Sequence, residues 1–378
     1  MSSLVDTLGL CVFETILGVL FISLLFVSLW GHLFILCLLC IACSALYRFI
    51  RKAGTKMVDT KGKYVLITGC DTGFGNSLAR LLDTKGLNVI ATCLSEESHG
   101  AKQLKTTGSR RMCVLQLDVT SGESISSCLQ IVKTLCHKEG LWALVNNAGI
   151  QYTGDVEVQA MAIYRKVAEV NLFGMVRMCK AFLPLVRQRK GRVINVTSVR
   201  GLIACQGHSA YVMSKFAGEG FTDCFRLEMR RFGVKVILVE PGGYGLSTGL
   251  FSVENVKQQK AVYQELLDSV DDEVRTAYGQ HYLDTYMRVP KMIPGSSDKD
   301  LKGVLDAFEH AILSSNPNSR YLVDGIRNKI DVLCMMARLR HFLPVSVMDV
   351  LYLWLQPLPK EAFYTTTSRS DLLLTSLM

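Results

Sequence analysis

The N-terminal part of this 378-residue chain contains almost no charge. Residues 1–47 have no Arg or Lys, and residues 15–47 have no charged side chain, with only His32 able to gain one near neutral pH. Without a basic region before the apolar run, a cleaved signal peptide is disfavoured, and the lack of Arg also disfavours a mitochondrial transit peptide. We therefore expect residues 1–47 to form an uncleaved membrane anchor.

The length of the apolar run leaves the number of membrane passes open. A helix over residues 15–47 would be about 50 Å long at 1.5 Å per residue, against about 30 Å of hydrocarbon. One span with an interfacial remainder, or a hairpin that turns near residues 30–32, would fit. Residues 48–62 form a basic linker, which favours a cytosolic location for the domain on its C-terminal side. The endoplasmic reticulum membrane is the expected location, with a mitochondrial membrane as the alternative.

Two further patterns are absent from the chain. No basic run with interleaved aromatic residues is present, so we expect no nucleic-acid partner in spite of the net charge of +9. The 13 cysteines have no repeating spacing, which argues against a disulfide framework and favours a reducing compartment. Cys37, Cys40 and Cys43 lie in the apolar run without acidic neighbours, so we expect no metal site there; palmitoylation is the alternative.

From Lys63 onward, short apolar runs alternate with helical patterns. The expected strands are residues 64–67, 88–92, 114–117, 143–145, 192–196 and 234–239. Buried apolar strands that alternate with helices indicate a parallel sheet covered on both faces. The predicted fold class is therefore α/β, a doubly wound parallel sheet in a domain at residues 63–330, followed by an apolar C-terminal segment at residues 331–378.

Glycines at 69, 73 and 75 lie between the first expected strand and a helical stretch at residues 76–85. Such a turn lets the backbone approach a pyrophosphate and directs the amino end of a helix at its negative charge. Because no Gly-Lys-Ser/Thr follows, the turn is not a Walker A loop. It predicts a Rossmann-like dinucleotide site.

Tyr211 and Lys215 are four residues apart in a helical pattern, so their side chains share one face. An ammonium beside a phenol favours the phenolate, so we expect Lys215 to lower the pKa of Tyr211 and make it a general acid/base. Ser198 follows the strand at residues 192–196, where its hydroxyl could hold a substrate oxygen. Asn171 could hold a water that relays protons to Lys215.

Taken with the Asn-Asn-Ala-Gly stretch at residues 146–149 and with Pro241-Gly242, these motifs resemble the short-chain dehydrogenase/reductase family. Within it, the chain is similar to the branch of retinol dehydrogenases, hydroxysteroid dehydrogenases and the animal D-3-hydroxybutyrate dehydrogenase. The resemblance implies hydride transfer between an alcohol carbon and a nicotinamide cofactor, with Asn171, Ser198, Tyr211 and Lys215 as catalytic residues. The implied cofactor-binding residues are Gly69, Asp71, Gly73, Phe74, Gly75, Asp118, Asn147, Ala148, Gly149, Tyr211, Lys215, Pro241 and Gly242.

The charges around the glycine turn favour NAD over NADP. Asp71 lies in the turn, and the stretch after the second expected strand, residues 92–97, carries acids only. A 2′-phosphate would be repelled there. We expect Asp71→Ser together with a basic residue at position 93 to shift the preference toward NADP.

Two features favour different substrates. The anchor would hold the pocket beside lipophilic alcohols or ketones of the hydroxysteroid or retinol class, with residues 246–292 as the substrate lid and residues 331–378 as pocket wall or membrane contact. By contrast, Gln151, Arg200 and His208 could hold the carboxylate of D-3-hydroxybutyrate. The lipophilic substrate is the preferred prediction. The resemblance also implies a homodimer.

Overall fold

The structure is a computed structural model that describes residues 56–244, 248, 253–279, 283, 300–325 and 331–355, together with isolated residues between 28 and 46. The chain divides into two units, Met1–Lys56 and Met57–Met378. Within the described part of the chain, no helix has the length and apolar character needed to cross a membrane. Most of residues 1–47 lie outside the described residues, so the anchor remains a prediction.

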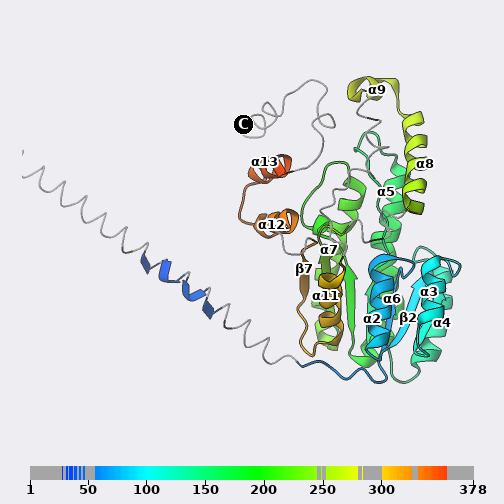
Figure 1. The fold of residues 1–378 in the computed structure, drawn as a ribbon. Coiled ribbons are helices and arrows are strands. Elements are labelled where there is room, and N and C mark those ends of the chain that lie inside the picture. Colours follow the sequence, from blue (N-terminus) through cyan, green and yellow to red (C-terminus); the bar gives the residue numbers. More distant parts are fainter. Residues whose placement is uncertain are drawn as a thin grey trace, which may run out of the picture. The chain divides into compact units, whose positions relative to one another are not determined.

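The second unit is built on a seven-stranded sheet in which all pairings are parallel (Figure 1). The strand order is β3-β2-β1-β4-β5-β6-β7, so the winding reverses between β1 and β4. The strands are β1 (Tyr64–Ile67), β2 (Asn88–Cys93), β3 (Met112–Gln116), β4 (Ala143–Asn146), β5 (Arg192–Val196), β6 (Lys235–Pro241) and β7 (Arg320–Val323). The predicted doubly wound fold is confirmed, and the edge strand β7 is an addition that the sequence pattern did not indicate.

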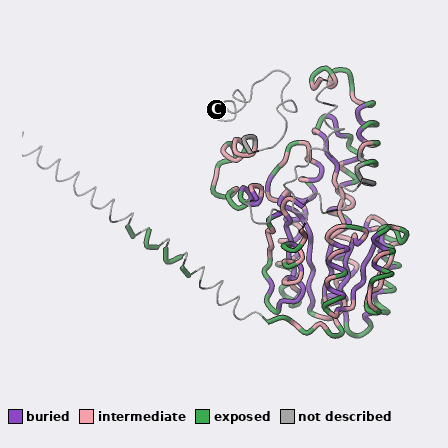
Figure 2. The backbone as a smooth tube through the Cα atoms, viewed as in Figure 1, coloured by how far each residue is buried: buried purple, intermediate pink, exposed green. Residues whose placement is uncertain are grey.

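Helices cover both faces of the sheet, and the central strands are buried along their length (Figure 2). Alternate strand residues point to opposite faces, which gives two separate apolar clusters. One face is covered by α2 (Gly73–Thr84), α3 (His99–Thr107) and α11 (Lys302–Leu313); the other is covered by α4 (Gly122–Cys136), α6 (Met175–Arg189) and α7 (Ser209–Met229). This two-sided cover explains why the strands read as continuous apolar runs.

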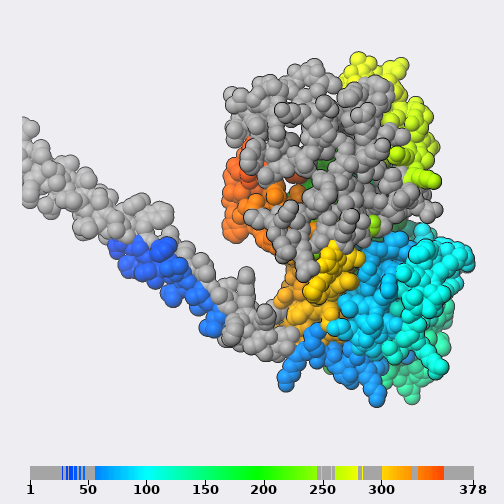
Figure 3. Space-filling view, viewed as in Figure 1, coloured from blue at the N-terminus to red at the C-terminus, as the bar shows by residue number. Residues whose placement is uncertain are grey.

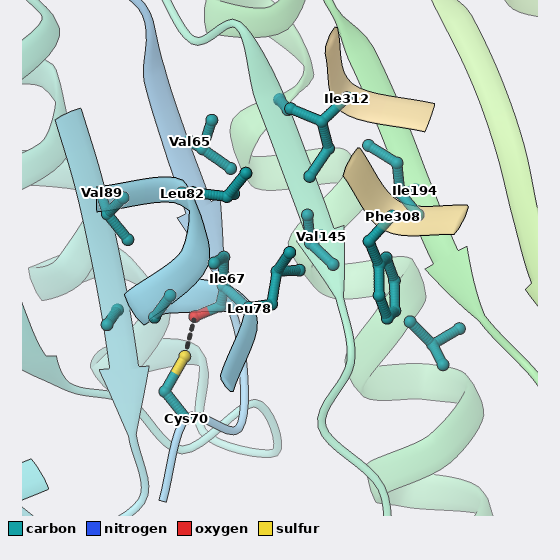
Figure 4. Close-up of a cluster of buried hydrophobic side chains, with 14 of the residues drawn as sticks. Val65, Ile67, Cys70, Leu78, Leu82, Val89, Val145, Ile194, Phe308 and Ile312 are labelled. Carbon is teal, nitrogen blue, oxygen red and sulfur yellow. Dashed lines mark hydrogen bonds between the residues drawn. The ribbon is translucent and has the colours of Figure 1, made fainter. Parts of the chain in front are cut away.

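The first apolar cluster joins the two ends of the domain sequence. Leu78 and Leu82 of α2 and Phe308 and Ile312 of α11 pack over the same strands (Figure 4). At the surface the two helices lie side by side (Figure 3), and Lys85 Nζ lies 2.7 Å from Glu309 Oε1. The residues after 300 therefore complete the sheet's cover rather than forming a separate domain.

The folded unit begins inside the stretch predicted as a linker, residues 48–62. Met57 pairs with Ser314 in an antiparallel bridge, and the Val58 amide donates to the Leu313 carbonyl at 2.8 Å. The last part of the predicted linker is thus bound to the end of α11.

Shorter elements lie beyond the carboxyl ends of the strands (Figure 1). The predicted lid at residues 246–292 contains α8 (Val253–Ser269) and α9 (Asp272–Tyr278), and the rest of it lies largely outside the described residues. The other short elements there are α5 (Met161–Ala168), the π-helix η1 (Glu169–Gly174), the 3-10 turn η2 (Val199–Gly201), α12 (Val332–Leu339) and α13 (Val345–Leu355), whereas the 3-10 turn η3 (Arg230–Phe232) lies at the opposite edge, just before β6. Residues of α12 and α13 pack on Val199 and Ile203, just after Ser198.

Candidate active site

The glycine turn has the backbone geometry that the sequence predicted. Gly69 and Gly73 have φ of +70° and +58°, a region that favours glycine. A Cβ atom at Gly75 would collide with the Gly69 carbonyl and the Asn147 side chain. Thr72, the N-cap of α2, makes no side-chain cap bond, so the first turn of the helix has no side-chain acceptor from its cap. That helix end is suited to accept a pyrophosphate.

The Asn-Asn-Ala-Gly stretch after β4 fastens this turn to the neighbouring strand. The Thr68 hydroxyl accepts from the Asn147 and Ala148 amides, both at 3.0 Å. Asn147 Nδ2 donates to the carbonyls of Thr68 and Gly69 at 2.9 and 3.1 Å. The Asn147 side chain therefore holds the turn in place. Thr68 was not singled out from the sequence, although it directly precedes the first glycine of the motif.

Two predicted cofactor residues support their own loops. Asp71 reaches the end of β2, where its carboxylate accepts from the Leu94 and Ser95 amides at 2.9 and 3.4 Å. Asp118 accepts from the amide and hydroxyl of Thr120 at 2.8 and 2.7 Å, in the turn before α4. Asp71 thus places a carboxylate at the end of β2.

Three more predicted cofactor residues make contacts near the end of β6: Phe74, Pro241 and Gly242. The Phe74 ring packs edge-on against Tyr244 with a centroid separation of 5.5 Å. The Pro241 carbonyl accepts from the Ser198 hydroxyl at 3.4 Å, and the Gly242 amide donates to the Val323 carbonyl at 2.8 Å. These contacts connect the end of β6 to β7 and to the candidate catalytic serine.

The four predicted catalytic side chains are buried at the carboxyl edge of the sheet. Their exposed fractions are 1% for Asn171, 5% for Lys215, and 8% for both Ser198 and Tyr211. The Ser198 side chain lies close enough to the Tyr211 hydroxyl to influence its pKa. Lys215 Nζ lies 5.5 Å from the centre of the Tyr211 ring and donates to the Val196 carbonyl at 3.0 Å. The structure therefore brings Ser198, Tyr211 and Lys215 together as the spacing predicted.

Asn171 lies in the π-helix η1 and is held by its neighbours. Its Oδ1 accepts from the Ile150 amide at 2.8 Å, and its Nδ2 donates to the Ile150 carbonyl and to Ser214 Oγ at 2.9 and 3.0 Å. A Cβ atom at Gly149 would lie 3.4 Å from Asn171 Oδ1 and 3.7 Å from Lys215 Nζ. Glycine therefore keeps open the space that borders both groups.

Burial decides the protonation of the Tyr211–Lys215 pair. It raises the pKa of Tyr211, against smaller lowering effects of the Ser198 hydrogen bond and the Arg200 charge. It also lowers the pKa of Lys215 to about 8, with the negative charge of Glu219 opposing. We predicted that Lys215 would lower the pKa of Tyr211; this was wrong, because desolvation favours the neutral form of each group and is the largest influence on each pKa. Glu219, one turn after Lys215, was not predicted.

Arg200 and His208, predicted to hold a substrate carboxylate, are bound to the loop between η2 and α7. Arg200 Nη1 donates to the Ala204 carbonyl at 3.2 Å, and His208 Nδ1 lies 3.0 Å from the Gln206 carbonyl oxygen and 3.4 Å from Cys205 Sγ. Gln151 is half buried after the Asn-Asn-Ala-Gly stretch. His208 is also the N-cap residue of α7, although its side chain makes no cap bond.

Comparison with known proteins agrees with this geometry. The family model described as short chain dehydrogenase matches residues 63–258. The chain is 40% identical to the mitochondrial D-beta-hydroxybutyrate dehydrogenase of Rattus norvegicus, over 72% of this chain and 80% of that enzyme. It is 41% identical to retinol dehydrogenase 16 of Rattus norvegicus, over 79% of this chain and 90% of that enzyme.

The fold also matches a solved structure. A short-chain dehydrogenase from Streptomyces avermitilis superposes with a TM-score of 0.57 at 24% identity, covering 77% of this chain and 96% of that one. The chain therefore belongs to the short-chain dehydrogenase family, in the branch of the retinol and D-β-hydroxybutyrate dehydrogenases, and is an oxidoreductase that acts on CH–OH donors.

Proposed function

We propose that this protein is a membrane-anchored, NAD-dependent dehydrogenase of lipophilic alcohols or ketones of the hydroxysteroid or retinol class, with Tyr211 as the general acid/base. The observation that carries the proposal is the buried Tyr211 side chain, with the Ser198 side chain close enough to influence its pKa and Lys215 Nζ 5.5 Å from the centre of its ring. As the phenolate, a tyrosine of this kind can take a proton from an alcohol, and as the phenol it can give one to a ketone.

Each residue of the site has a separate role in alcohol oxidation. Tyr211 accepts the hydroxyl proton of the substrate, and Ser198 holds the same oxygen through its own hydroxyl. Lys215, when cationic, stabilises the phenolate form of Tyr211. A bound nicotinamide supplies the hydride acceptor. Asn171 bonds the Ile150 amide and carbonyl and so fixes the wall beside the Lys215 ammonium.

The glycine turn fits such a cofactor. The N-terminus of α2 lacks a side-chain cap, and its glycines allow close approach of a pyrophosphate. The proposal favours NAD because the Asp71 carboxylate lies at the end of β2, bound to the Leu94 and Ser95 amides. Lys102 and Lys105 of α3 are already paired with Glu97 and Glu96 at 2.7 and 2.6 Å, which leaves little positive charge for a 2′-phosphate.

A lipophilic substrate is supported by the contacts of Arg200 and His208, the two residues that could hold a substrate carboxylate. Arg200 and His208 both make contacts within their own loop, to Ala204, Cys205 and Gln206. A substrate carboxylate would have to displace these partners. The exposed apolar side chains of Phe342 and Val345, 82% and 77% exposed, add surface that a membrane could cover. We place the anchored enzyme in the endoplasmic reticulum membrane, with a homodimer as its expected assembly.

D-3-hydroxybutyrate oxidation is the second candidate. It is favoured by Arg200, whose amide donates to the Ser198 hydroxyl at 3.2 Å and whose charge lowers the pKa of Tyr211. A carboxylate two carbons from the reacting alcohol could pair with this guanidinium.

A substrate screen separates the two candidates. The full chain is purified in detergent, and NADH formation is followed with a hydroxysteroid, retinol and D-3-hydroxybutyrate. We expect kcat/KM for retinol or the steroid to exceed that for hydroxybutyrate by at least about tenfold. Arg200→Ala is compared with Arg80→Ala, a change at an exposed position of α2. Activity confined to hydroxybutyrate and lost only in Arg200→Ala would overturn the lipophilic assignment.

A further inference from the structure

Glu219 is a buried acid one turn after Lys215 on α7. Residues four apart on a helix have Cβ atoms about 5–6 Å apart on one face, so the two side chains are neighbours. Glu219 is 7% exposed and packs against η2, the turn that follows Ser198. A Cβ atom at Gly201 of this turn would lie 3.0 Å from Glu219 Oε1 and 3.1 Å from the Lys215 carbonyl oxygen. Glu219 therefore fills the space between the helix that carries Lys215 and the turn that follows Ser198.

A cation from the edge of the sheet holds the Glu219 carboxylate. Arg320, the first residue of β7, has its Nη1 2.5 Å from Glu219 Oε2, and the same nitrogen pairs with Glu240 of β6. Its Nη2 lies 3.1 Å from Asp223 Oδ2, one turn further along α7. Glu240 is fully buried, whereas Asp223 is half exposed. Three carboxyl groups thus share one guanidinium, which ties β7 to the helix of Lys215.

The charges in this cluster leave Glu219 as the acid that acts on Lys215. Burial and the negative charge of Glu219 raise the pKa of Glu240 to about 8, so Glu240 is mostly protonated below that pH. Arg200, the cation of η2, donates to a backbone carbonyl of its own loop. The charge of Glu219 raises the pKa of Lys215, against the larger lowering effect of burial. The carboxylate therefore favours the ammonium form of Lys215.

We propose that Glu219 is a positioning residue for the proton transfer: fixed by Arg320, its carboxylate keeps Lys215 in the cationic form that ketone reduction by Tyr211 needs. The inference rests on the proposed function only through the Tyr211–Lys215 pair, and it holds for either class of substrate. Without the charge of Glu219, burial acts on Lys215 unopposed, and the ammonium loses its proton at a lower pH. Reduction, which uses the doubly protonated pair, then stops at a lower pH.

The test compares ketone reduction at pH 6 and pH 8, followed as loss of NADH with the full chain in detergent. The probe is the carbonyl form of the alcohol that the native chain oxidises best: retinaldehyde, the oxosteroid or acetoacetate. Glu219→Gln keeps the shape of the side chain and removes its charge. We expect the midpoint of the pH profile to move from about 8 to about 7. The doubly protonated fraction at pH 8 then falls from about one half to about one tenth, so the rate falls roughly fivefold there and stays nearly native at pH 6.

Three further variants separate charge from disturbance of the cluster. Asp223→Asn removes another partner of Arg320, one turn further from Lys215, and should leave the midpoint near pH 8. Glu240→Gln removes the neighbouring acid that also titrates near pH 8 and should leave the midpoint in place as well. Glu219→Asp keeps the negative charge on a shorter side chain, and its midpoint should lie between those of the native chain and Glu219→Gln.

The outcomes distinguish this inference from the proposed function. A loss of reduction in Glu219→Gln that is as large at pH 6 as at pH 8 would indicate a purely structural role and overturn the inference. An unchanged midpoint in Glu219→Gln, or an equal shift in Asp223→Asn, would also overturn it. A native inflection that disappears in Glu240→Gln would assign the titration to that acid instead. An inflection that persists in Lys215→Arg would contradict the proposed Tyr211–Lys215 pair itself, and the inference with it.

Discussion

Strand β5 has a buried cation at each of its ends, and the two cations differ in what surrounds them. At the amino end, Arg192 is 2% exposed; its Nη1 donates to the Ala311 and Ser314 carbonyls at 2.8 and 3.0 Å. Its guanidinium also lies 4.2 Å from the centre of the Trp142 ring. At the carboxyl end, Lys215 Nζ donates to the Val196 carbonyl at 3.0 Å.

Burial lowers the pKa of both cations, with different consequences. The pKa of Arg192 falls to about 10, so this residue stays charged near neutral pH. The pKa of Lys215 falls to about 8, so its charge changes within the range in which an enzyme works. At the amino edge of the sheet the cation fastens the end of α11, whereas the proposed function gives the cation at the carboxyl edge a part in proton transfer.

The largest effect is expected at the carboxyl edge, from Tyr211→Phe. Because the phenol is the proposed general acid/base, its removal should lower kcat by about 10²- to 10⁴-fold while the melting temperature stays nearly unchanged. The matched control is Tyr321→Phe in β7, whose hydroxyl bonds His310 Nδ1 at 2.6 Å and which should keep its turnover. Full activity in Tyr211→Phe would contradict the proposed catalytic role of the carboxyl edge.

The two cations can be tested directly against each other with Lys215→Met and Arg192→Met. Lys215→Met should lower kcat about a hundredfold and change stability little, since the gain from removing a buried charge is offset by the loss of the donor to the Val196 carbonyl. Arg192→Met should leave the kcat of the folded protein unchanged and lower the free energy of unfolding by about 2–4 kcal/mol, since two buried carbonyls lose their donor. Initial rates measure kcat, and denaturant unfolding measures the free energy of unfolding. A loss of stability in Lys215→Met together with a loss of kcat in Arg192→Met would refute the comparison.

The sequence predicted the carboxyl edge better than the amino edge. Glycines, the Asn-Asn-Ala-Gly stretch and the Tyr211–Lys215 spacing are local patterns tied to the ends of predicted strands, so the doubly wound parallel sheet and the proximity of Ser198 to Tyr211 could be predicted. The role of Arg192 could not, because its partners Ala311 and Ser314 lie more than a hundred residues away. The ion pair between Glu219 and Arg320 was missed for the same reason.

The prediction of a lowered pKa for Tyr211 was wrong for another reason. Helical spacing shows that Lys215 lies near Tyr211 but carries no information about burial, which is the largest influence on the pKa of each group. β7 was missed because it is a four-residue edge strand of half-buried residues that begins with Arg320.

Cofactor preference is a smaller and more specific test of the carboxyl edge. We suggested a basic residue at position 93, but Cys93 is fully buried at the end of β2, whereas Leu94 is 61% exposed. Asp71→Ser with Leu94→Arg should therefore raise the ratio of kcat/KM for NADP to that for NAD by about tenfold to a hundredfold. The control is Asp71→Ser with Leu94→Gln, which removes the carboxylate without adding charge. An unchanged ratio in the Leu94→Arg variant would contradict the account of Asp71.

The smallest expected effect is the pH dependence of the two reaction directions. Below pH 8 the pair of Tyr211 and Lys215 holds two protons, and above it one, because burial lowers the pKa of Lys215 to about 8 and raises that of Tyr211. Oxidation must add the alcohol proton to this pair, so the rate of oxidation should rise about tenfold between pH 7 and pH 9. Reduction uses the doubly protonated pair and should fall over the same range.

The inflection near pH 8 can be assigned with Lys215→Arg. An arginine at this position keeps its proton throughout the range, so the opposite trends of oxidation and reduction between pH 7 and pH 9 should disappear in this variant. Arg192 cannot substitute as the source of the inflection, because its pKa lies near 10. Initial rates in both directions at saturating substrate and cofactor measure the profile. If Lys215→Arg kept the native inflection, the titrating cation would not be the one at the carboxyl end of β5, and the contrast between the two ends of the strand would lose its functional meaning.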